Sequence, residues 1–593
     1  MKNKDKIIKS GIIIVSITGL TLCIAMLFPQ VRQMIIGFAE RMMHRKTSLY
    51  GDWSKTLLSY AVGGISLIIL FGYCLLTASG KTLVRNVRNE IGECLTVIDW
   101  RSFIKLVLIM SGIYLLGTGS LIRANFLYND DILRSITGDR RWYDWSRYVA
   151  EFFSVFIHAD YRLTDISPLP QIIAVLILSG SSVLLVYVLN NNKITVIGLL
   201  ASVPLGLSPY MLECLSFKFD APYMALSVLA SIVPFLFVSR EKAFVFCSVI
   251  CLLIMCMTYQ AASGIYLLIL LVLCFMEWNG KRKTNRDITL FLERAVVSFG
   301  AAMLIFKLFL MKPYSTYVST EILPLPQLFS GISTNFLTYI NFINSDFGFI
   351  WKALIGIICC FFIAKSIGNS ARNKIISLFA AIILLFLLFF FSYGAYLALE
   401  RPYFVPHAMY AFGVLLAIMG IYVASGYNKP AKIFALALSW SFLVFALSYG
   451  NALADQKRYV DFRATILLQD LSALFPDKDK EDNKISIQMK NTVEFTAEVR
   501  NIAEHNPVIY RLVPRKLRGD IMFSYIYILE HFNYAPLSAT NYPWNMKNGE
   551  PYVDFNTLDL PVVLKTCYHT IKSDGKRVLV ELNEMGNAGK NTE

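Results

Sequence analysis

Charged residues are scarce in this chain of 593 residues. Aspartate, glutamate, lysine and arginine together make up 16% of it, whereas hydrophobic residues make up 56%. Soluble domains carry about 25% charged residues, so the composition excludes an ordinary soluble protein. The mean hydropathy of +0.53 and the recurring apolar stretches of bilayer length instead predict a mainly α, polytopic membrane protein.

Motifs of several other protein classes are missing as well. The polar tail after Gly450 has no glycine-rich phosphate loop and no cysteines and histidines at metal-binding spacing. The chain has 11 cysteines, but most lie in apolar stretches and only Cys567 lies well within the tail, so no disulfide framework is predicted. No internal repeat is visible, although many secondary transporters are built from repeats.

Apolar windows predict about thirteen transmembrane helices. We expect an N-terminal two-helix membrane region over 1–102, a transmembrane core over 103–449 with a long outer loop at 123–170, and a small extracytoplasmic α/β domain over 450–593. The windows lie at 7–28, 56–79, 103–122, 171–189, 194–212, 220–239, 243–258, 260–277, 294–312, 349–366, 374–395, 406–424 and 431–449.

The distribution of positive charge predicts the orientation. The N-terminus is rich in lysine and is therefore predicted to be cytoplasmic, and an odd number of spans then places the tail outside. The net charge is +15, but the residues after 450 include about 18 basic and 19 acidic side chains. The excess positive charge thus belongs to the membrane half, where its expected partner is anionic lipid and not nucleic acid.

The polar regions have their own expected elements. In the tail, 484–488 and 507–512 are predicted strands, 521–532 a helix, and 562–570 with 577–582 a hairpin that turns at Ser573-Asp574-Gly575. The outer loop is predicted to form two short helices separated at Gly138-Asp139. The aromatic face of the second, from Trp142 to Phe156, is typical of a helix lying in the membrane interface.

Two adjacent carboxylates, Asp130 and Asp131, follow the span at 103–122. Ionisable groups near lipid are costly, so they indicate function. Arg134 lies three or four residues further on, within reach of either carboxylate on a helix, and an ionised carboxylate here suits a general base that acts on a sugar hydroxyl. The pair could also hold a divalent metal, although no metal is required. The alternative is a charged run that only solvates an interfacial helix.

Further candidates lie near the ends of other spans. Arg147 continues the charged run of the outer loop, and Lys218 and Asp220 lie between two predicted spans. Asp220 could bind substrate or could simply cap the helix that it precedes.

Two more groups complete the set of candidates. Arg401, with His407 nearby, lies at a span end, where a guanidinium could grip a lipid phosphate or extend to the interface beside Glu400. Tyr259-Gln260 could bind sugar or satisfy a helix end.

The order of these motifs resembles the type-II glucosyltransferase family, bacterial GT-C enzymes that decorate O-antigen and related surface glycans. The likeness extends over roughly residues 100–420 and differs at Ser146-Arg147, where the family pattern implies Gly-Arg. It rests on the Asp-Asp pair after a span, Gly138 with Trp142 and Arg147, Ser208-Pro209 with Phe219-Asp220 and Pro222, and Thr258-Tyr259-Gln260-Ala261.

The resemblance implies a GT-C glycosyltransferase in the cytoplasmic membrane. Its expected donor is a polyprenyl-phosphate sugar such as glucose, and its expected acceptor is a surface polysaccharide or a lipid-linked glycan. Asp131 or Asp130 would be the catalytic base, and the expected substrate-binding residues are Arg134, Arg147, Lys218, Asp220, Tyr259, Gln260, Arg401 and His407.

Two alternatives remain at this point. A transporter or flippase of lipid-linked sugar would require ionisable groups near mid-membrane. A polysaccharide polymerase or ligase would differ only in taking an oligosaccharide donor.

Overall fold

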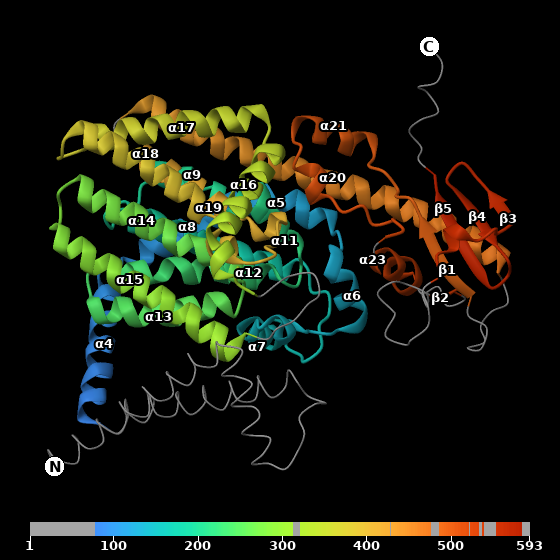
Figure 1. The fold of residues 1–593 in the computed structure, drawn as a ribbon, viewed down its shortest axis with the longest axis horizontal. Helices are drawn as coiled ribbons and strands as arrows, with labels where there is room; N and C mark the ends of the chain where they lie inside the picture. The colour runs from blue at the N-terminus through green and yellow to red at the C-terminus, as the bar shows by residue number, and fades with distance from the viewer. Residues whose placement is uncertain are drawn as a thin grey trace.

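The computed structural model describes residues 77–311, 321–426, 428–475, 485–520, 522–532, 537–538 and 553–583. These residues form a helical bundle joined to a smaller unit that contains a β-sheet (Figure 1). The predicted spans at 7–28 and, apart from its last residues, 56–79 lie outside the described residues.

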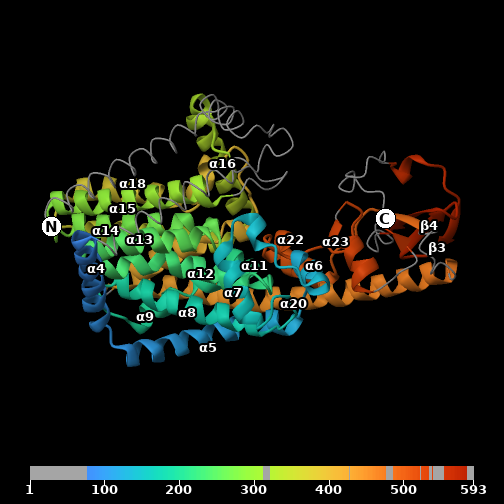
Figure 2. The same ribbon diagram turned by 90° about the horizontal axis from the view of Figure 1, so that it is seen from below.

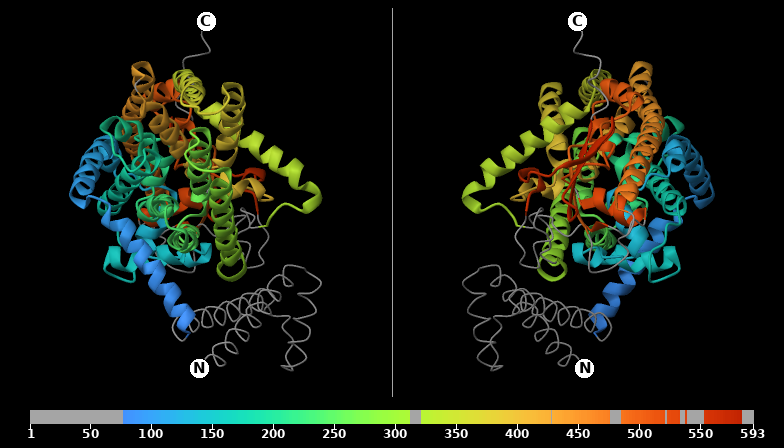
Figure 3. Two further views of the ribbon diagram at one scale, coloured as in Figure 1. Left: turned by 90° about the vertical axis from the view of Figure 1, so that its left-hand side faces the viewer. Right: turned by 90° about the vertical axis from the view of Figure 1, so that its right-hand side faces the viewer.

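Within this part of the chain, seven helices are long and apolar enough to cross a membrane. They run roughly along the long axis of the molecule (Figure 1) and are seen nearly end on in Figure 3. Each matches one of the predicted windows. They are α5 (Trp100–Ala124), α8 (Leu169–Leu189), η3 with α14 (Gln260–Asn279), α15 with η4 (Asn285–Leu310), α17 (Phe349–Gly368), α18 (Lys374–Phe391) and α20 (Lys429–Leu474).

Four other predicted windows form shorter or bent helices. The window at 194–212 becomes a pair of segments bent by 57°, which would make an eighth span if counted as one. The predicted total of thirteen spans is therefore not confirmed. These helices are α9 (Val196–Ala201), α10 (Pro204–Leu207) and α11 (Pro209–Ser216) in the bent pair, then α12 (Ala221–Ile232) with η2 (Val233–Phe237), α13 (Glu241–Cys256) and α19 (Ala411–Ala424).

Local signals explain where the helix beside the outer loop begins and ends. α5 begins after Asp99, whose carboxylate accepts hydrogen bonds from the backbone N–H groups of Arg101 and Ser102. It ends at Asn125, which has a left-handed φ of 44°. α20 packs closely on α5 at Gly450, where a Cβ would lie 2.3 Å from the Leu121 nitrogen. Small residues allow such a close approach between helices in membranes.

The two ends of the bundle differ in character. At the end farthest from the sheet, α4 (Ala78–Thr96) lies across the helices (Figure 2). Loops that carry basic residues meet there: Arg282 donates to Asn191, and Arg372 donates to Asn285. The outer loop and the sheet-containing unit lie at the opposite end. Which end faces the cytoplasm stays a prediction.

The outer loop folds as two short helices with a break at Gly138, as predicted. α6 (Asn129–Thr137) ends at Gly138, which has φ of 71°, and α7 (Tyr148–His158) follows after the short turn η1 (Trp142–Trp145). Phe152 and Phe156 are exposed, as an interfacial face requires. The prediction was wrong for Trp142, which is completely buried because its indole binds a carboxylate in the interior.

The remaining helices and turns connect the spans near this end. They are α16 (Leu328–Asp346), which is seen projecting from the bundle in Figure 2, η5 (Leu325–Gln327), η6 (Gly394–Ala398) and η7 (Pro406–Ala408).

The C-terminal unit is a small α/β structure fed by α20, which continues past residue 450 without a break. A five-stranded sheet has the order β2-β1-β5-β4-β3, with β1 parallel to both of its neighbours and the other pairs antiparallel. Its strands are β1 (Ile485–Lys490), β2 (Leu537–Ser538), β3 (Val562–Lys565), β4 (His569–Ser573) and β5 (Arg577–Leu582).

The predicted elements of this unit are mostly found. The helix predicted at 521–532 is present as α23 (Met522–Tyr525) and η9 (Ile526–His531). The strand predicted at 562–570 is instead divided between β3 and β4, and β4 forms a hairpin with β5 at the predicted turn. The strand predicted at 507–512 is not found. This segment forms the short helix α22 (Ile509–Leu512), next to α21 (Ala497–His505), because it packs as a turn against the bundle and not beside a strand. The division of the chain into three domains stays a prediction.

Candidate functional site

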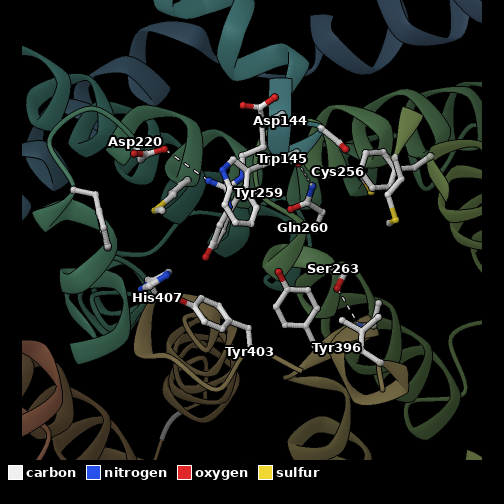
Figure 4. A pocket seen from close by; sticks show the side chains of 18 of the residues that line it. Asp144, Trp145, Asp220, Cys256, Tyr259, Gln260, Ser263, Tyr396, Tyr403 and His407 are labelled. Atoms are coloured by element: carbon white, nitrogen blue, oxygen red, sulfur yellow. Dashed lines mark hydrogen bonds and ion pairs between the residues drawn. The ribbon is translucent and has the colours of Figure 1, made fainter. Parts of the chain in front are cut away.

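A cavity of about 620 Å³ lies where α6, η1, η3, η6 and η7 meet. Its volume is within the usual range of small-molecule sites. Seven of the ten predicted site residues line it, although they come from segments far apart in the sequence: Asp130, Arg134, Arg147, Asp220, Tyr259, Gln260 and His407. Figure 4 shows several of these side chains around a common space.

Asp130 and Arg134 enter the cavity from α6. They are four residues apart and therefore lie on the same face of the helix. The Asp130 side chain is exposed to the cavity. The protein around the cavity partly removes it from bulk water, which raises the pKa of the Asp130 carboxyl above its usual range, and the positive charge of Arg134 opposes the shift.

Asp131 occupies a different environment from its neighbour. It is completely buried and does not line the cavity. One carboxyl oxygen, Oδ2, accepts hydrogen bonds from the Tyr128 nitrogen at 3.3 Å and the Lys218 nitrogen at 3.0 Å, while Oδ1 has a long contact of 3.5 Å with the Phe219 nitrogen. Asp131 thus ties the start of α6 to the turn that precedes Asp220.

Asp220 holds the two arginines of the cavity. One carboxyl oxygen pairs with Arg134, and the other accepts the Trp142 indole N–H at 2.6 Å and lies 3.7 Å from Arg147. The Asp220 side chain makes no capping bond at α12, so the alternative capping role is not observed. Its side chain is only 6% exposed, which makes these contacts strong because water does not compete for them.

Arg147 is held between Asp220 and an aromatic ring. Its guanidinium lies 4.4 Å from the centre of the Tyr259 ring, a cation–π arrangement. In the described part of the chain, the buried Nε of Arg147 has no hydrogen-bond partner. Gln260 anchors this region because its side-chain amide donates to the Trp145 carbonyl oxygen at 3.4 Å. A cation with unused donor capacity beside a cavity suits an anionic ligand.

The backbone at residue 146 has a conformation that favours glycine, the residue that the family pattern implies there. Ser146 has φ of 60°, in the left-handed region that glycine adopts without cost. The resemblance implied Gly-Arg at this point, and the backbone shows why glycine suits it.

His407 is oriented by a buried carboxylate. Its Nδ1 lies 2.8 Å from a Glu213 carboxyl oxygen, which also accepts the His407 backbone N–H. The other Glu213 carboxyl oxygen lies 3.0 Å from the Tyr128 hydroxyl oxygen. Since Nδ1 faces a carboxylate, it carries the proton, and Nε2 is left for other partners. Tyr403 lies beside the His407 ring (Figure 4).

Two predicted binding residues, like Asp131, lie outside the lining of this cavity. Lys218 is buried, and its ammonium group binds Asn125 and, at 2.9 Å, Asp165. Arg401 is exposed and does not line the cavity. The geometry of the cavity supports neither residue as a binding group.

Sequence reasoning missed several lining residues. Some come from α15, η4 and the residue after them and form an apolar wall with one cation: Met303, Phe306, Lys307 and Met311. Since η4 is a π-helical turn, it matches a feature that is frequent at functional sites. Others are Tyr396, Tyr403, Met522 and Phe523. No sequence signal marked them, because only the fold brings them to this space.

The described residues contain no group of three or more histidine, cysteine, aspartate or glutamate side chains that could hold a metal ion. Asp130 and Asp131 face different surroundings, so they do not form the paired carboxylate site that adjacency suggested.

Comparison with known proteins places this geometry in context. A family model described as Glucosyl transferase GtrII matches residues 119–445. A protein of Salmonella phage P22, described as an uncharacterized 55.3 kDa protein in the gtrB 5' region, is 23% identical over 482 residues, which cover 79% of this chain and 97% of the phage protein. No solved structure matches the chain.

Proposed function

This chain belongs to the GtrII glucosyltransferase family, and we propose that it transfers glucose from a polyprenyl-phosphate donor to a hydroxyl group of a surface polysaccharide or lipid-linked glycan. The proposed enzyme is a GT-C glycosyltransferase of the cytoplasmic membrane. The family model covers more than half of the chain and nearly all of the cavity.

One observation carries the proposal: a carboxylate and two arginines face the same cavity. Asp130 is the proposed general base, in preference to Asp131, because only Asp130 lines the cavity. Its raised pKa brings it closer to neutral pH, where a base is most effective.

In the proposed reaction, the acceptor oxygen forms a bond to the anomeric carbon of the sugar while the bond from that carbon to the phosphate oxygen breaks. The acceptor proton passes to Asp130, and the bonding electrons leave with the phosphate. The transition state resembles an oxocarbenium ion, as in glycoside hydrolysis.

Arg134 and Arg147 are the proposed partners of the departing phosphate. Asp220 fixes both guanidinium groups from behind, so little reorganisation is needed when negative charge develops. Guanidinium groups can bind two phosphate oxygens at once. Lys307, on the apolar wall of α15 and η4, adds a third positive charge to the same cavity.

The apolar wall of α15 and η4 is the proposed binding surface for the lipid part of the donor. Met303 and Phe306 belong to a helix that is long and apolar enough to cross a membrane. A polyprenyl chain in the bilayer could therefore approach along this helix while its phosphate reaches the arginines.

The proposed location is the outer face of the cytoplasmic membrane, with the N-terminus inside and the C-terminal unit outside. This orientation is supported by the gathering of basic loops at the end of the bundle far from the cavity, as the positive-inside rule expects. A transporter is less favoured because the ionisable cluster lies at one end of the spans. A polymerase or ligase would require an oligosaccharide donor.

Asp130→Asn in full-length protein tests the proposal. Membranes that contain the protein are supplied in turn with radiolabelled polyprenyl-phosphate glucose and a polyprenyl-diphosphate oligosaccharide. We expect transfer from the glucose donor only, and a loss of about 10²–10⁴-fold in rate in the variant.

Asp139→Asn is the matched control, because Asp139 lies in the same loop with a side chain that is 47% exposed and paired at the surface with Arg141. Normal turnover by Asp130→Asn would remove Asp130 as the base. Transfer from the oligosaccharide donor alone would favour the polymerase or ligase.

A further inference from the structure

The C-terminal unit is joined to the cavity region by buried polar contacts. The Leu512 carbonyl oxygen of α22 accepts the hydroxyl groups of Tyr128, at 2.6 Å, and Tyr449, at 3.2 Å. The Tyr128 hydroxyl also contacts Glu213, the residue that orients His407. The unit is therefore part of the framework that holds the site.

A second connection runs through Arg511. Its guanidinium pairs with Asp346 at the end of α16 and donates to the Phe404 carbonyl oxygen at 2.7 Å. Phe404 lies in the segment that carries Tyr403 and His407 into the cavity. One arginine of the C-terminal unit thus connects α16 with that segment.

The unit also contributes side chains to the cavity itself. Met522 and Phe523 of α23 line it, and α23 packs against α6, the helix that carries Asn129 and Asp130. Phe523 is partly buried against the apolar core of the C-terminal unit, which holds its ring in place. An apolar surface therefore lies on the Asp130 side of the cavity.

Two apolar walls of the cavity belong to different parts of the fold, and this indicates which substrate each one meets. The wall of α15 and η4 belongs to a candidate span, so it suits a lipid tail. The α23 wall belongs to the unit with the sheet, outside the candidate spans. The α23 wall thus lies outside the candidate spans and beside α6, which carries the proposed base.

We propose that Phe523, supported by Met522, forms the acceptor-binding wall of the cavity and makes the C-terminal unit the part of the protein that selects the glycan acceptor. The ring offers a flat apolar face of the kind against which a sugar ring packs, at low cost in conformational entropy. This inference rests on the proposed glucosyl transfer and assigns a specificity role to Phe523.

The test uses full-length protein in membranes with radiolabelled polyprenyl-phosphate glucose as donor and glycan extracted from the producing cells as acceptor. Two products are measured, labelled glycan and free glucose released by water. For Phe523→Ala we expect the apparent KM for the glycan to rise about tenfold or more and the ratio of labelled glycan to free glucose to fall, while the donor KM stays unchanged. Phe523→Tyr should restore both values because it keeps the ring.

Phe532→Ala is the matched control. Phe532 packs against the same core as Phe523 but does not line the cavity. If loss of core packing were the cause, both alanine variants would lower the melting temperature and reduce both products alike. Met522→Ala removes an exposed side chain, so it should affect folding less. It is a second test of the acceptor KM and the product ratio.

The outcomes separate the two proposals. If the unaltered protein consumes no polyprenyl-phosphate glucose, the proposed function fails. If it transfers glucose but the acceptor KM and product ratio are the same in Phe523→Ala, Met522→Ala and the control, the inference about the C-terminal unit is overturned.

Discussion

Replacing Asp131 tests whether this residue is a structural neighbour of the catalytic base. We expect Asp131→Ala to weaken folding severely and Asp131→Asn to be tolerated. The reason lies in the hydrogen bonds: a single oxygen, Oδ2, accepts both short bonds, from the nitrogens of Tyr128 and Lys218. Asparagine can supply the same oxygen, whereas alanine supplies none.

The magnitude follows from the two amide groups. Each buried N–H that loses its acceptor costs about 1–3 kcal/mol, so the alanine variant should lose about 2–6 kcal/mol of unfolding free energy. This is a large part of the total stability of a typical protein, about 5–15 kcal/mol. The asparagine variant should stay within about 1 kcal/mol of the unaltered protein.

The pH dependence has a definite sign. Burial raises the pKa of Asp131 from 3.8 to about 8, so between these values the folded state keeps a proton that the unfolded chain has released. The contribution of Asp131 to the unfolding free energy is therefore full below about pH 4 and is lost as the pH rises through about 8. Asparagine does not titrate, so the stability of the unaltered protein relative to Asp131→Asn should fall over this interval.

The assay is denaturant titration of purified full-length protein in detergent micelles, followed by tryptophan fluorescence from pH 5 to pH 8. Glucosyl transfer is measured on the same samples at pH 7. The reasoning is refuted if Asp131→Asn is as unstable as Asp131→Ala at pH 6, because Asp131 would then be needed as an anion. Loss of transfer in a stable Asp131→Asn variant would return Asp131 to the list of candidate bases.

Three further substitutions probe other parts of the site. Arg147→Lys should lower kcat/KM for the polyprenyl-phosphate donor about 10-fold or more, because an ammonium group cannot bind two phosphate oxygens at once. The melting temperature should change little. Unchanged donor kinetics would exclude the phosphate role of Arg147. Burial lowers the pKa of Lys516 to about 7 although its ammonium lies 4.1 Å from the Phe126 ring. The unfolded chain therefore binds a proton that the folded state lacks between about pH 7 and 10.5, so the destabilisation by Lys516 grows as the pH falls from 10.5 to about 7 and is complete below that. Lys516→Met should raise the melting temperature at pH 6 more than at pH 9, and an equal change at both values would contradict this. Ser146→Gly should preserve activity and cost no more than about 1 kcal/mol in denaturant titration, since φ is 60°, whereas a larger loss would show that the Ser146 side chain is essential.

Several features of this protein were predictable from the sequence because they depend on neighbouring residues alone. The length of an apolar stretch is set by the thickness of the bilayer, so seven predicted spans coincide with candidate membrane helices. The spacing of Asp130 and Arg134 places them on one helix face whatever packs against it. The motif order around Trp142, Asp220 and Tyr259 was sufficient to indicate the family, which the family model confirms.

The choice between Asp130 and Asp131 could be made only from the tertiary structure. Successive residues on a helix point about 100° apart, and which of the two meets the cavity depends on the turn at 217–220 that packs against α6. In the same way, Arg401 and Lys218 have the right chemistry but lie outside the cavity lining, whereas Phe523 reaches it from the other end of the chain. The sequence determined which segments are helical and apolar because those properties are local, and only long-range packing decided which side chains share one enclosed space.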